Sequence, residues 1–443
     1  MKLLKLGLAA MLLLFCASVL FAGGDQEPSG PVTVTFMVHE ADLPKDFVDS
    51  FKADNPNINL VRVEANWEKW MADALAGTAA DLMQVNGYQT AYFTHRGLWL
   101  DMTDMMEESE MFQWDDIDPL GNVHYQYDGK QYGKGPWYGL TKDYNNIGCI
   151  TYNREMFKDA GLADLSTTKR VTYENEYYDL AKKLTQKDSS GNVIIFGTEF
   201  TGGWAAYWAS DMAYAKGTSF WASDEAAKMN NDSKMRDIWK YWAKFKVDDI
   251  AANSRNPASG WTGAMFQSDR VAMVQLGYWF GAQMMSNEGY NEKYGWAPTP
   301  ILKSGSKPYA NTLGATGTAI YAKTRYPKAA FRVFEWYNAG EYGLERARTG
   351  WGIPPLYSLH QYLPKDNKFN QDRLSIALED AKYFVPYMGG MTPFADPGPL
   401  FNGAWNAYID DLVGGKINYD TFVDKFYADI DDVLAAGKEE LGM

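Results

Sequence analysis

The sequence predicts an α/β protein of two lobes, and three observations lead to that prediction. In the first hundred residues, short β-branched runs alternate with amphipathic segments, as strands and helices do in parallel α/β structure. The chain has 443 residues, whereas one domain usually has about 100–200. It has neither an internal repeat nor a low-complexity linker, so we expect the chain to cross between the lobes more than once.

Three predicted strands, at residues 31–38, 58–63 and 81–85, open the first lobe. The helix between the first two strands begins near Pro44 and ends at Asn55, which precedes a proline. The helix between the second and third strands has apolar residues three and four positions apart, which predicts one buried face. These residues are Trp67, Trp70, Met71, Ala74 and Leu75.

The rest of the chain alternates in the same way but less regularly. A helix is predicted to open at Tyr152 and to end at Gly161. A long helical stretch over 411–441 is interrupted by Gly414 and Gly415. The other predicted strands are 193–196, 270–276 and 316–322, and the other predicted helices are 89–96, 173–184, 234–245 and 328–336.

The N-terminus has the pattern of a secretory signal peptide. Two lysines precede an apolar run over 6–21, which is short for a membrane span of about 20 apolar residues. Small residues follow, so we predict cleavage after Ala22 and a periplasmic or otherwise extracytoplasmic protein. Lipid attachment at Cys16 is the alternative, although Phe15 stands where a lipoprotein signal prefers a small residue.

Charge, cysteine and aromatic content narrow the class of protein. The formal net charge is −14, and removal of the two signal lysines makes it −16, which argues against nucleic acid as a partner. Cleavage leaves Cys149 as a single cysteine, so the mature chain forms no internal disulfide. The 16 Trp, 29 Tyr and 22 Phe exceed what a core needs, and we expect some of these rings to line a ligand surface.

Motifs for catalysis and metal binding are missing from the sequence. The chain has no HExxH, Walker loop or G-x-S-x-G, and its four histidines are scattered. We therefore predict no catalytic residue, no metal and no cofactor. In parallel sheets, ligands lie beyond the carboxyl ends of the strands, which here points to residues 39–42 and 86–89.

Short motifs follow one another in a fixed order over residues 51–355. Two of them are 51–57 (FKADNPN) and 264–273 (AMFQSDRVAM), and the others are at 74–81, with Ala80 for a usual proline, 97–103, 138–141, with Thr141 for a proline, 152–162, 277–279, 295–298, 328–331 and 350–355. Each motif is weak alone, but the ordered set resembles the extracellular solute-binding proteins of carbohydrate ABC importers, the family of the maltose-binding proteins. The first two motifs are similar to that family's "F…NP.I.V" turn and to its "AF..GK.AM".

The resemblance implies a two-lobed periplasmic-binding-protein fold of type II, in which each lobe has a central, mostly parallel sheet flanked by helices. The ligand would bind in the cleft between the lobes, and closure about hinges would present the loaded protein to the membrane permease of an ABC importer. We expect a monomer. The implied N-terminal lobe is residues 23–142 and 318–340, and the C-terminal lobe is 143–317 and 341–443. The implied crossings are 141–145, 313–318 and 338–342.

By the same resemblance, tryptophans would stack on the flat faces of a sugar. Trp279, just beyond a predicted strand, and Trp405, near the start of the late C-terminal helix, match two stacking tryptophans of similar sugar binders. Trp204 follows two glycines and matches a loop aromatic of the second lobe, and Trp351 lies on a loop between two glycines. Trp67, on a predicted helix face, is a further candidate. Core packing is the alternative for each of them.

Groups that bond sugar hydroxyls would complete such a site. Glu40 follows the first strand, with a role at a helix start as its alternative. Tyr88 and Gln89 follow the third strand, at positions that relatives use for charged sugars, and neither residue is charged here. Asp143 and Asn145 lie at the first implied crossing.

The predicted function is therefore capture of a sugar and its delivery to an importer. The uncharged side chains after the third strand and the acidic chain favour a neutral mono- or oligosaccharide. A secreted glycoside hydrolase is one alternative, because it also needs aromatic platforms and paired carboxylates. A peptide or amino-acid binder on the same fold is the other, although it would need charged groups for both termini of its ligand.

Overall fold

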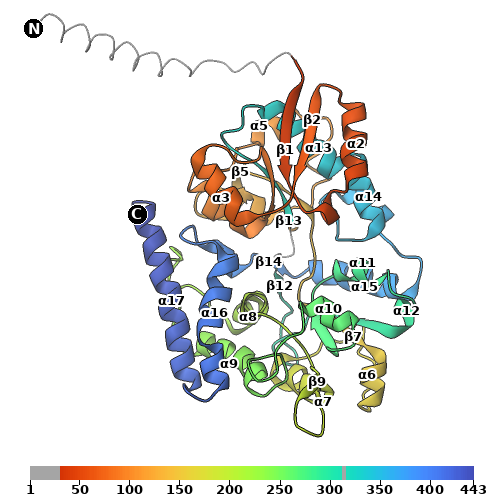
Figure 1. The fold of residues 1–443 in the computed structure, drawn as a ribbon, viewed down its shortest axis with the longest axis vertical. Helices are drawn as coiled ribbons and strands as arrows, with labels where there is room; N and C mark the ends of the chain where they lie inside the picture. Colours follow the sequence, from red (N-terminus) through yellow and green to blue (C-terminus); the bar gives the residue numbers. More distant parts are fainter. Residues whose placement is uncertain (1–29, 312–315) are drawn as a thin grey trace, which may run out of the picture.

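The structure, a computed structural model, describes residues 30–311 and 316–443. It has two lobes, with the N-terminal strands in one and the middle of the chain and its C-terminal helices in the other (Figure 1). The predicted signal peptide over 1–22, with Cys16, and residues 313–315 of the implied crossing at 313–318 lie outside the described residues. Among the helices that the structure describes, none combines the length and the apolar character that crossing a membrane requires.

The first lobe is built on a five-stranded sheet in the order β2–β1–β3–β13–β6. Strand β1 (Val32–Met37) runs parallel to β2 (Ile58–Val63) and to β3 (Leu82–Asn86). Strand β13 (Thr316–Ile320) is antiparallel to both β3 and β6 (Leu140–Asp143). The three strands predicted at the start of the chain therefore occur, each within one residue of its predicted bounds.

Helices cover both faces of this sheet (Figure 1). On one face, Phe51 of α2 packs against Trp336 of α13, with ring centroids 4.9 Å apart. On the other face, Trp70 of α3 meets Phe93 of α4 edge-on at 5.5 Å. The helices of this lobe include α2 (Lys45–Asp54), α3 (Trp67–Ala76), α4 (Thr90–Thr94), α5 (Thr103–Glu108), α13 (Pro327–Ala339) and α14 (Glu341–Thr349).

The second lobe has a three-stranded sheet, and its strand directions correct the expectation of a mostly parallel sheet in each lobe. Its central strand β7 (Ile150–Asn153) is antiparallel to β10 (Met273–Gln275) and to β11 (Tyr294–Ala297). Strand β7 leads away from the first lobe just after the chain has crossed, whereas β10 ends near the cleft, shortly before Trp279. The order of strands and helices in the sequence does not predict the direction of a strand such as β7, because the chain enters that strand from the other lobe.

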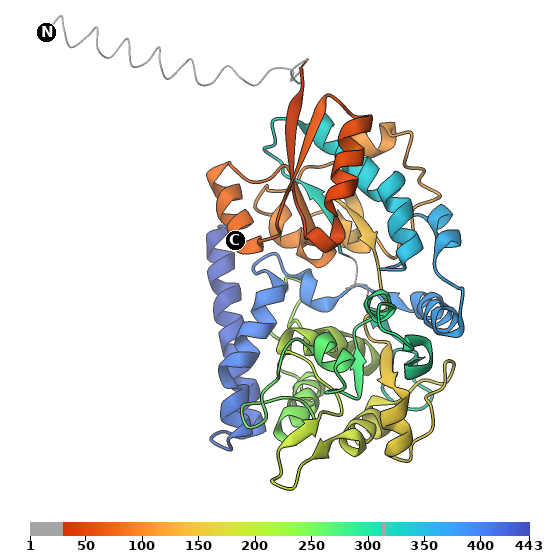
Figure 2. The ribbon, with the colours of Figure 1, turned by 45° about the vertical axis from the view of Figure 1, so that its right-hand side comes forward.

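Many helices surround this smaller sheet. In Figure 2, α16 and α17 lie side by side along one edge of the molecule, and the end of α17 reaches the first lobe. The helices are α6 (Arg154–Asp159), α7 (Tyr178–Leu184), α8 (Gly202–Lys216), α9 (Ser233–Val247), α10 (Thr262–Gln267), α11 (Phe280–Met284), α12 (Tyr290–Lys293), α15 (Lys368–Ala381), α16 (Pro397–Val413) and α17 (Tyr419–Glu440). Outside the two main sheets, the described residues also form three pairs of short strands. These are β4 (Gln126–Tyr127) with β5 (Tyr132–Trp137), β8 (Gln186–Lys187) with β9 (Val193–Ile195), and β12 (Ala310–Asn311) with β14 (Phe384–Val385).

Two elements differ from the sequence prediction for local reasons. Tyr152 does not open a helix but belongs to β7, and Asn153 then caps α6 by accepting a hydrogen bond from the backbone N–H of Glu155 at 3.0 Å. Helix α8 was not predicted. Most of its residues are buried, so apolar side chains occur all round the helix and no amphipathic period marks it.

The crossings between the lobes also differ in part from expectation. The chain leaves β6 and crosses next to Tyr144, whose backbone exchanges hydrogen bonds of 2.8 and 3.0 Å with that of Ile353. No crossing occurs at 338–342, because α14 stays with the first lobe and Tyr342 stacks on Trp336 at 5.6 Å. Gly340 separates two helices of one core rather than two lobes, so the implied lobe boundary at residue 341 is too early.

Candidate ligand-binding site

A cavity of about 350 Å³ lies where the two lobes face each other. Its size falls in the range of about 300–1,000 Å³ that small-molecule sites occupy. Side chains from both lobes and from the loop after α14 line it. These are Asp42, Gln84, Asn86, Tyr88, Lys142, Asp143, Asn145, Ile147, Trp204, Tyr207, Trp279, Thr316 and Trp351.

The first-lobe wall of the cavity follows from the direction of the strands. Asp42 lies in the turn η1 (Glu40–Asp42) after β1, and Asn86 and Tyr88 come at the end of β3. Because β1 and β3 are parallel, their carboxyl ends meet at one edge of the sheet, and the turns that follow them meet there too. Asp143 ends β6 at the same edge, opposite Thr316 of β13.

Aromatic rings form the other wall. The indoles of Trp204, Trp279 and Trp351 are half-buried, so part of each remains free to contact a ligand. The rings of Trp279 and Trp351 lie 6.1 Å apart at 51°. The backbone N–H of Trp279 donates to Oδ1 of Asn145 at 2.7 Å, which ties this indole to the crossing. Trp204 lies in the first turn of α8, and its ring centroid is 5.5 Å from that of Tyr207, one turn further on.

The first-lobe wall contains a cluster of buried charged side chains. Nζ of Lys142 is 2.9 Å from Oδ1 of Asp42 and 2.9 Å from Oδ2 of Asp143. Nε2 of Gln84 donates to the other oxygen of Asp42 at 2.7 Å. Burial alone would lower the pKa of Lys142, but the two carboxylates outweigh it and hold that pKa above its ordinary value. The lysine is therefore charged at neutral pH.

Arg346 of α14 completes the cluster. Its Nη2 donates to the backbone oxygen of Lys142 at 3.3 Å, and its guanidinium lies over the ring of Tyr337 at 4.2 Å. Burial raises the pKa of Asp143, whereas for Asp42 burial is outweighed by the contact with Lys142, which lowers its pKa. Two buried acidic side chains thus lie beside two buried basic ones, so the formal charges of the cluster balance. A wall of this kind offers hydrogen-bonding groups to a ligand without an unbalanced charge.

Six of the ten residues predicted from sequence line the cavity, and four lie elsewhere. Those in the lining are Tyr88, Asp143, Asn145, Trp204, Trp279 and Trp351. Trp204 is in the first turn of α8 and not, as predicted, on a loop.

The other four candidates have roles within the fold. Trp405 lies in the middle of α16, 1% exposed, and packs edge-on against Phe422. Glu40 points outward and pairs with Arg62 at 3.3 Å. The other two are Gln89, buried between the backbone of Asn86 and the carboxylate of Asp396, and Trp67, packed on His39.

Sequence reasoning missed seven of the lining residues, although a signal existed for several. Asp42 and Asn86 lie within the two segments that the strand-end rule indicated, and Lys142 precedes the predicted Asp143. Tyr207 stands three positions after Trp204, which is helical spacing, but α8 was not recognised as a helix. The others are Gln84, Ile147 and Thr316.

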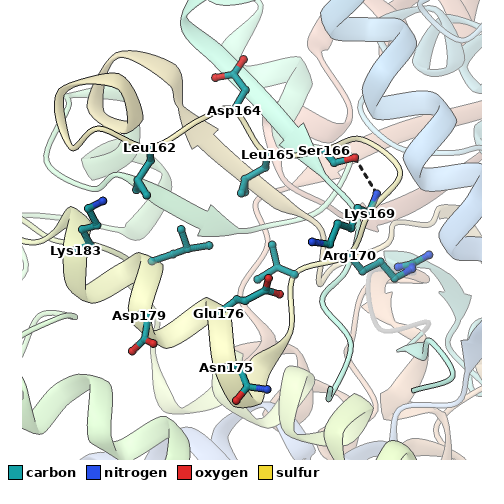
Figure 3. A pocket seen from close by; sticks show the side chains of 12 residues that line it. Leu162, Asp164, Leu165, Ser166, Lys169, Arg170, Asn175, Glu176, Asp179 and Lys183 are labelled. Carbon is teal, nitrogen blue, oxygen red and sulfur yellow. Dashed lines mark hydrogen bonds between the residues drawn. The ribbon is translucent and has the colours of Figure 1, made fainter. Parts of the chain in front are cut away.

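A second depression, of about 470 Å³, lies within the second lobe, and we do not assign the ligand to it. Figure 3 shows that this depression lies between the loop that carries Leu162 and Leu165 and the helix α7, which carries Asp179 and Lys183. Its lining includes no aromatic ring and no residue of the first lobe, so a ligand there could not close the cleft. Within residues 30–311 and 316–443, no group of three or more His, Cys, Asp or Glu side chains is placed to hold a metal.

Comparison with known families agrees with this geometry. The sequence profile of the bacterial extracellular solute-binding proteins matches residues 38–342, well over half of the chain. The chain belongs to this family. Its members are non-enzymatic receptors of ABC transporters that work outside the cytoplasm. No curated protein matches this solute-binding protein in a sequence search.

Solved structures share the fold of this solute-binding protein at low sequence identity. An ABC substrate-binding protein from Listeria monocytogenes, in complex with cycloalternan, has a TM-score of 0.74 at 17% identity, over 92% of this chain and 100% of that one. A solute-binding protein from Thermotoga lettingae, bound with α-D-tagatose, has a TM-score of 0.71 at 18% identity, over 92% and 100%. The maltose/maltodextrin-binding domain MalE from Bdellovibrio bacteriovorus, bound to maltotriose, has 0.68 at 17%, over 90% and 99%. The two-lobed periplasmic-binding-protein fold is thereby confirmed.

Proposed function

We propose that this solute-binding protein captures a neutral sugar in its interlobe cleft and delivers it to the permease of an ABC importer. The observation that carries the proposal is the pairing of half-buried indoles with a charge-balanced polar wall. Indole faces suit the C–H faces of a sugar ring, and the amide and carboxylate oxygens of the other wall suit its hydroxyls. With a signal peptide predicted over residues 1–22, the protein would act outside the cytoplasm.

Two further observations support a neutral ligand. The acidic side chains of Asp42 and Asp143 are balanced in number by the basic side chains of Lys142 and Arg346, so an ionic ligand would meet no unbalanced formal charge in this wall. Structural neighbours are described with cycloalternan, α-D-tagatose, maltotriose and the polyols D-mannitol and ribitol, which are all uncharged.

The first test is thermal unfolding of residues 23–443 in the presence of single mono- and oligosaccharides. A bound sugar stabilises the folded state by about 2.7 kcal/mol at 100 times its Kd, which raises Tm measurably. The variant Trp279→Ala should lose most of this rise. Trp114→Ala, which removes an exposed indole outside the cavity lining, should keep it.

Other results of the same assay would change the assignment. A response to uronates or sugar phosphates alone would mean that the ligand is charged. A response to amino acids or peptides alone would replace a sugar by the other ligand class considered. Chromatography of the recovered ligand should return it unchanged, and its consumption would contradict a pure binding role.

A further inference from the structure

A tryptophan outside the cavity, Trp261, continues the row of indoles that Trp279 and Trp351 begin. Trp261, just before α10, is not in the cavity lining, yet its ring lies 6.2 Å from that of Trp279 at only 17°. Trp279 in turn neighbours Trp351. The three rings therefore extend from the cavity toward the start of α10, and Figure 1 shows α10 and α11 in the second lobe.

The ring of Trp261 packs on Gly263 and Phe280 while remaining open to solvent. The side chain is 47% exposed, the largest value for any tryptophan among the described residues. Its ring covers Gly263, where an added Cβ would come within 2.1 Å of the indole, and it meets Phe280 edge-on at 6.0 Å. Only glycine at position 263 leaves room for this arrangement. A rigid, exposed aromatic ring costs little conformational entropy when it binds a ligand.

We propose that Trp261 is an outer subsite that stacks on a sugar unit projecting from the cleft, so that the ligand is a neutral oligosaccharide rather than a monosaccharide. This inference rests on the proposed function and deepens it. The cavity holds the inner unit against Trp279 and Trp351, and the next units follow the indole row outward. Each additional unit that stacks on a ring removes apolar surface from water.

Isothermal titration calorimetry with malto-, cello- and xylo-oligosaccharides of one to five units tests the subsite. We expect Trp261→Ala to weaken binding of the recognised oligosaccharides about three- to tenfold, the usual worth of one aromatic contact, and to leave the monosaccharide unchanged. Trp261→Phe should restore most of the loss, because it keeps a ring. Trp114→Ala removes an indole that is 44% exposed on the other lobe and serves as the matched control.

The possible outcomes separate this inference from the proposed function. If a neutral sugar binds but Trp261→Ala leaves every Kd unchanged, or weakens the monosaccharide equally, the outer subsite is wrong and sugar capture stands. If no neutral sugar binds the wild type, both proposals fail.

A second measurement reads ligand binding in the wild-type protein and uses a variant only to assign one resonance. In protein labelled with 5-fluorotryptophan, the ¹⁹F resonance missing from Trp261→Phe identifies Trp261. This resonance should shift when the recognised oligosaccharide binds and should not shift with its monosaccharide. A Trp261 signal that ignores the oligosaccharide would overturn the inference.

Discussion

At the scale of single residues, burial separates side chains that serve the cleft from those that serve the core. Trp279 and Trp405 both resemble stacking tryptophans in the sequence, but Trp405 is 1% exposed and surrounded by α16 and α17. Nothing in the residues adjacent to either tryptophan distinguishes them. The difference arises because the next helix, α17, and the sequence-remote helix α8 both pack on Trp405, whereas the indole of Trp279 stays half-buried.

His124 is a single residue whose burial makes stability depend on pH. It is 1% exposed, and its Nε2 accepts a hydrogen bond from the backbone N–H of Tyr387 at 3.1 Å. Burial lowers the pKa of this imidazole from 6.5 to about 3, because a charged ring there would lose its hydration. Between pH 6.5 and about 3, the folded protein therefore keeps His124 neutral while the unfolded chain binds the proton.

We predict that this histidine reduces stability as pH falls. The unfolded chain gains a proton below pH 6.5 and the folded one does not, so stability is full above pH 6.5 and is lost between pH 6.5 and about 3. The loss is about 1.4 kcal/mol per pH unit, or about 2 kcal/mol between pH 6.5 and 5. Tm of His124→Gln should fall less steeply over this interval than Tm of the wild type. Equal slopes would mean that His124 is not held neutral.

At the scale of elements, helix α8 shows how one position fixes the contact between two helices. The helix begins at Gly202, and a Cβ added there would come within 2.3 Å of the side chain of Trp405 on α16. The next residue, Gly203, has more room, since its nearest neighbour would be 3.6 Å away. The glycine pair that looked like a loop in the sequence therefore marks a close helix contact, and α8 brings Trp204 and Tyr207 to the cavity.

We predict opposite effects for the two glycines. Gly202→Ala should destabilise the protein by about 1–3 kcal/mol, because the methyl group forces α8 and α16 apart. Gly203→Ala should be neutral or stabilising by about 0.4–1 kcal/mol, because alanine restricts the unfolded chain. Thermal unfolding of both variants measures the difference. A Gly202→Ala protein as stable as Gly203→Ala would show that the contact can relax without cost.

At the scale of the whole molecule, a pairing far from the hinge joins the two lobes. Arg96, after α4 in the first lobe, donates from Nε and Nη2 to both carboxylate oxygens of Glu440 at the end of α17, each at 3.1 Å. Its Nη1 donates to the backbone oxygen of Pro393 at 2.9 Å. Figure 2 shows the end of α17 beside the first lobe. Because these bonds join the two lobes, they would break if the lobes moved apart on this side.

We predict that breaking this pairing favours the open form. Glu440→Gln should cost the closed state about 1 kcal/mol and shift closure about fivefold, because Glu440 is itself well exposed. Small-angle scattering without sugar should then give a larger radius of gyration, which the recognised sugar reverses. Glu225→Gln, whose partner Lys438 lies in the same lobe, is the control and should not change the radius. An unchanged radius in Glu440→Gln would show that other contacts keep the lobes closed.

The sequence by itself determined the class of fold and the edge of the first sheet that borders the interlobe cavity. Periodicity located the strands β1, β2 and β3, and the strand-end rule indicated segments 39–42 and 86–89, which contain Asp42 and Tyr88. These features depend on neighbours a few residues apart. Local patterns therefore carry them.

Only the tertiary structure decided which candidate residues line the cleft and in which directions the strands of the second lobe run. Trp405 lies in the core and not in the cleft. The crossing from the other lobe sets the direction of β7. Helix α8 shows no amphipathic pattern in the sequence, because most of its residues are buried by neighbouring elements. The charge-balanced cluster that joins Asp42 to Arg346 through Lys142 unites residues about 300 positions apart in the chain. Contacts of that sequence separation leave no local pattern, because the packing of whole elements creates them.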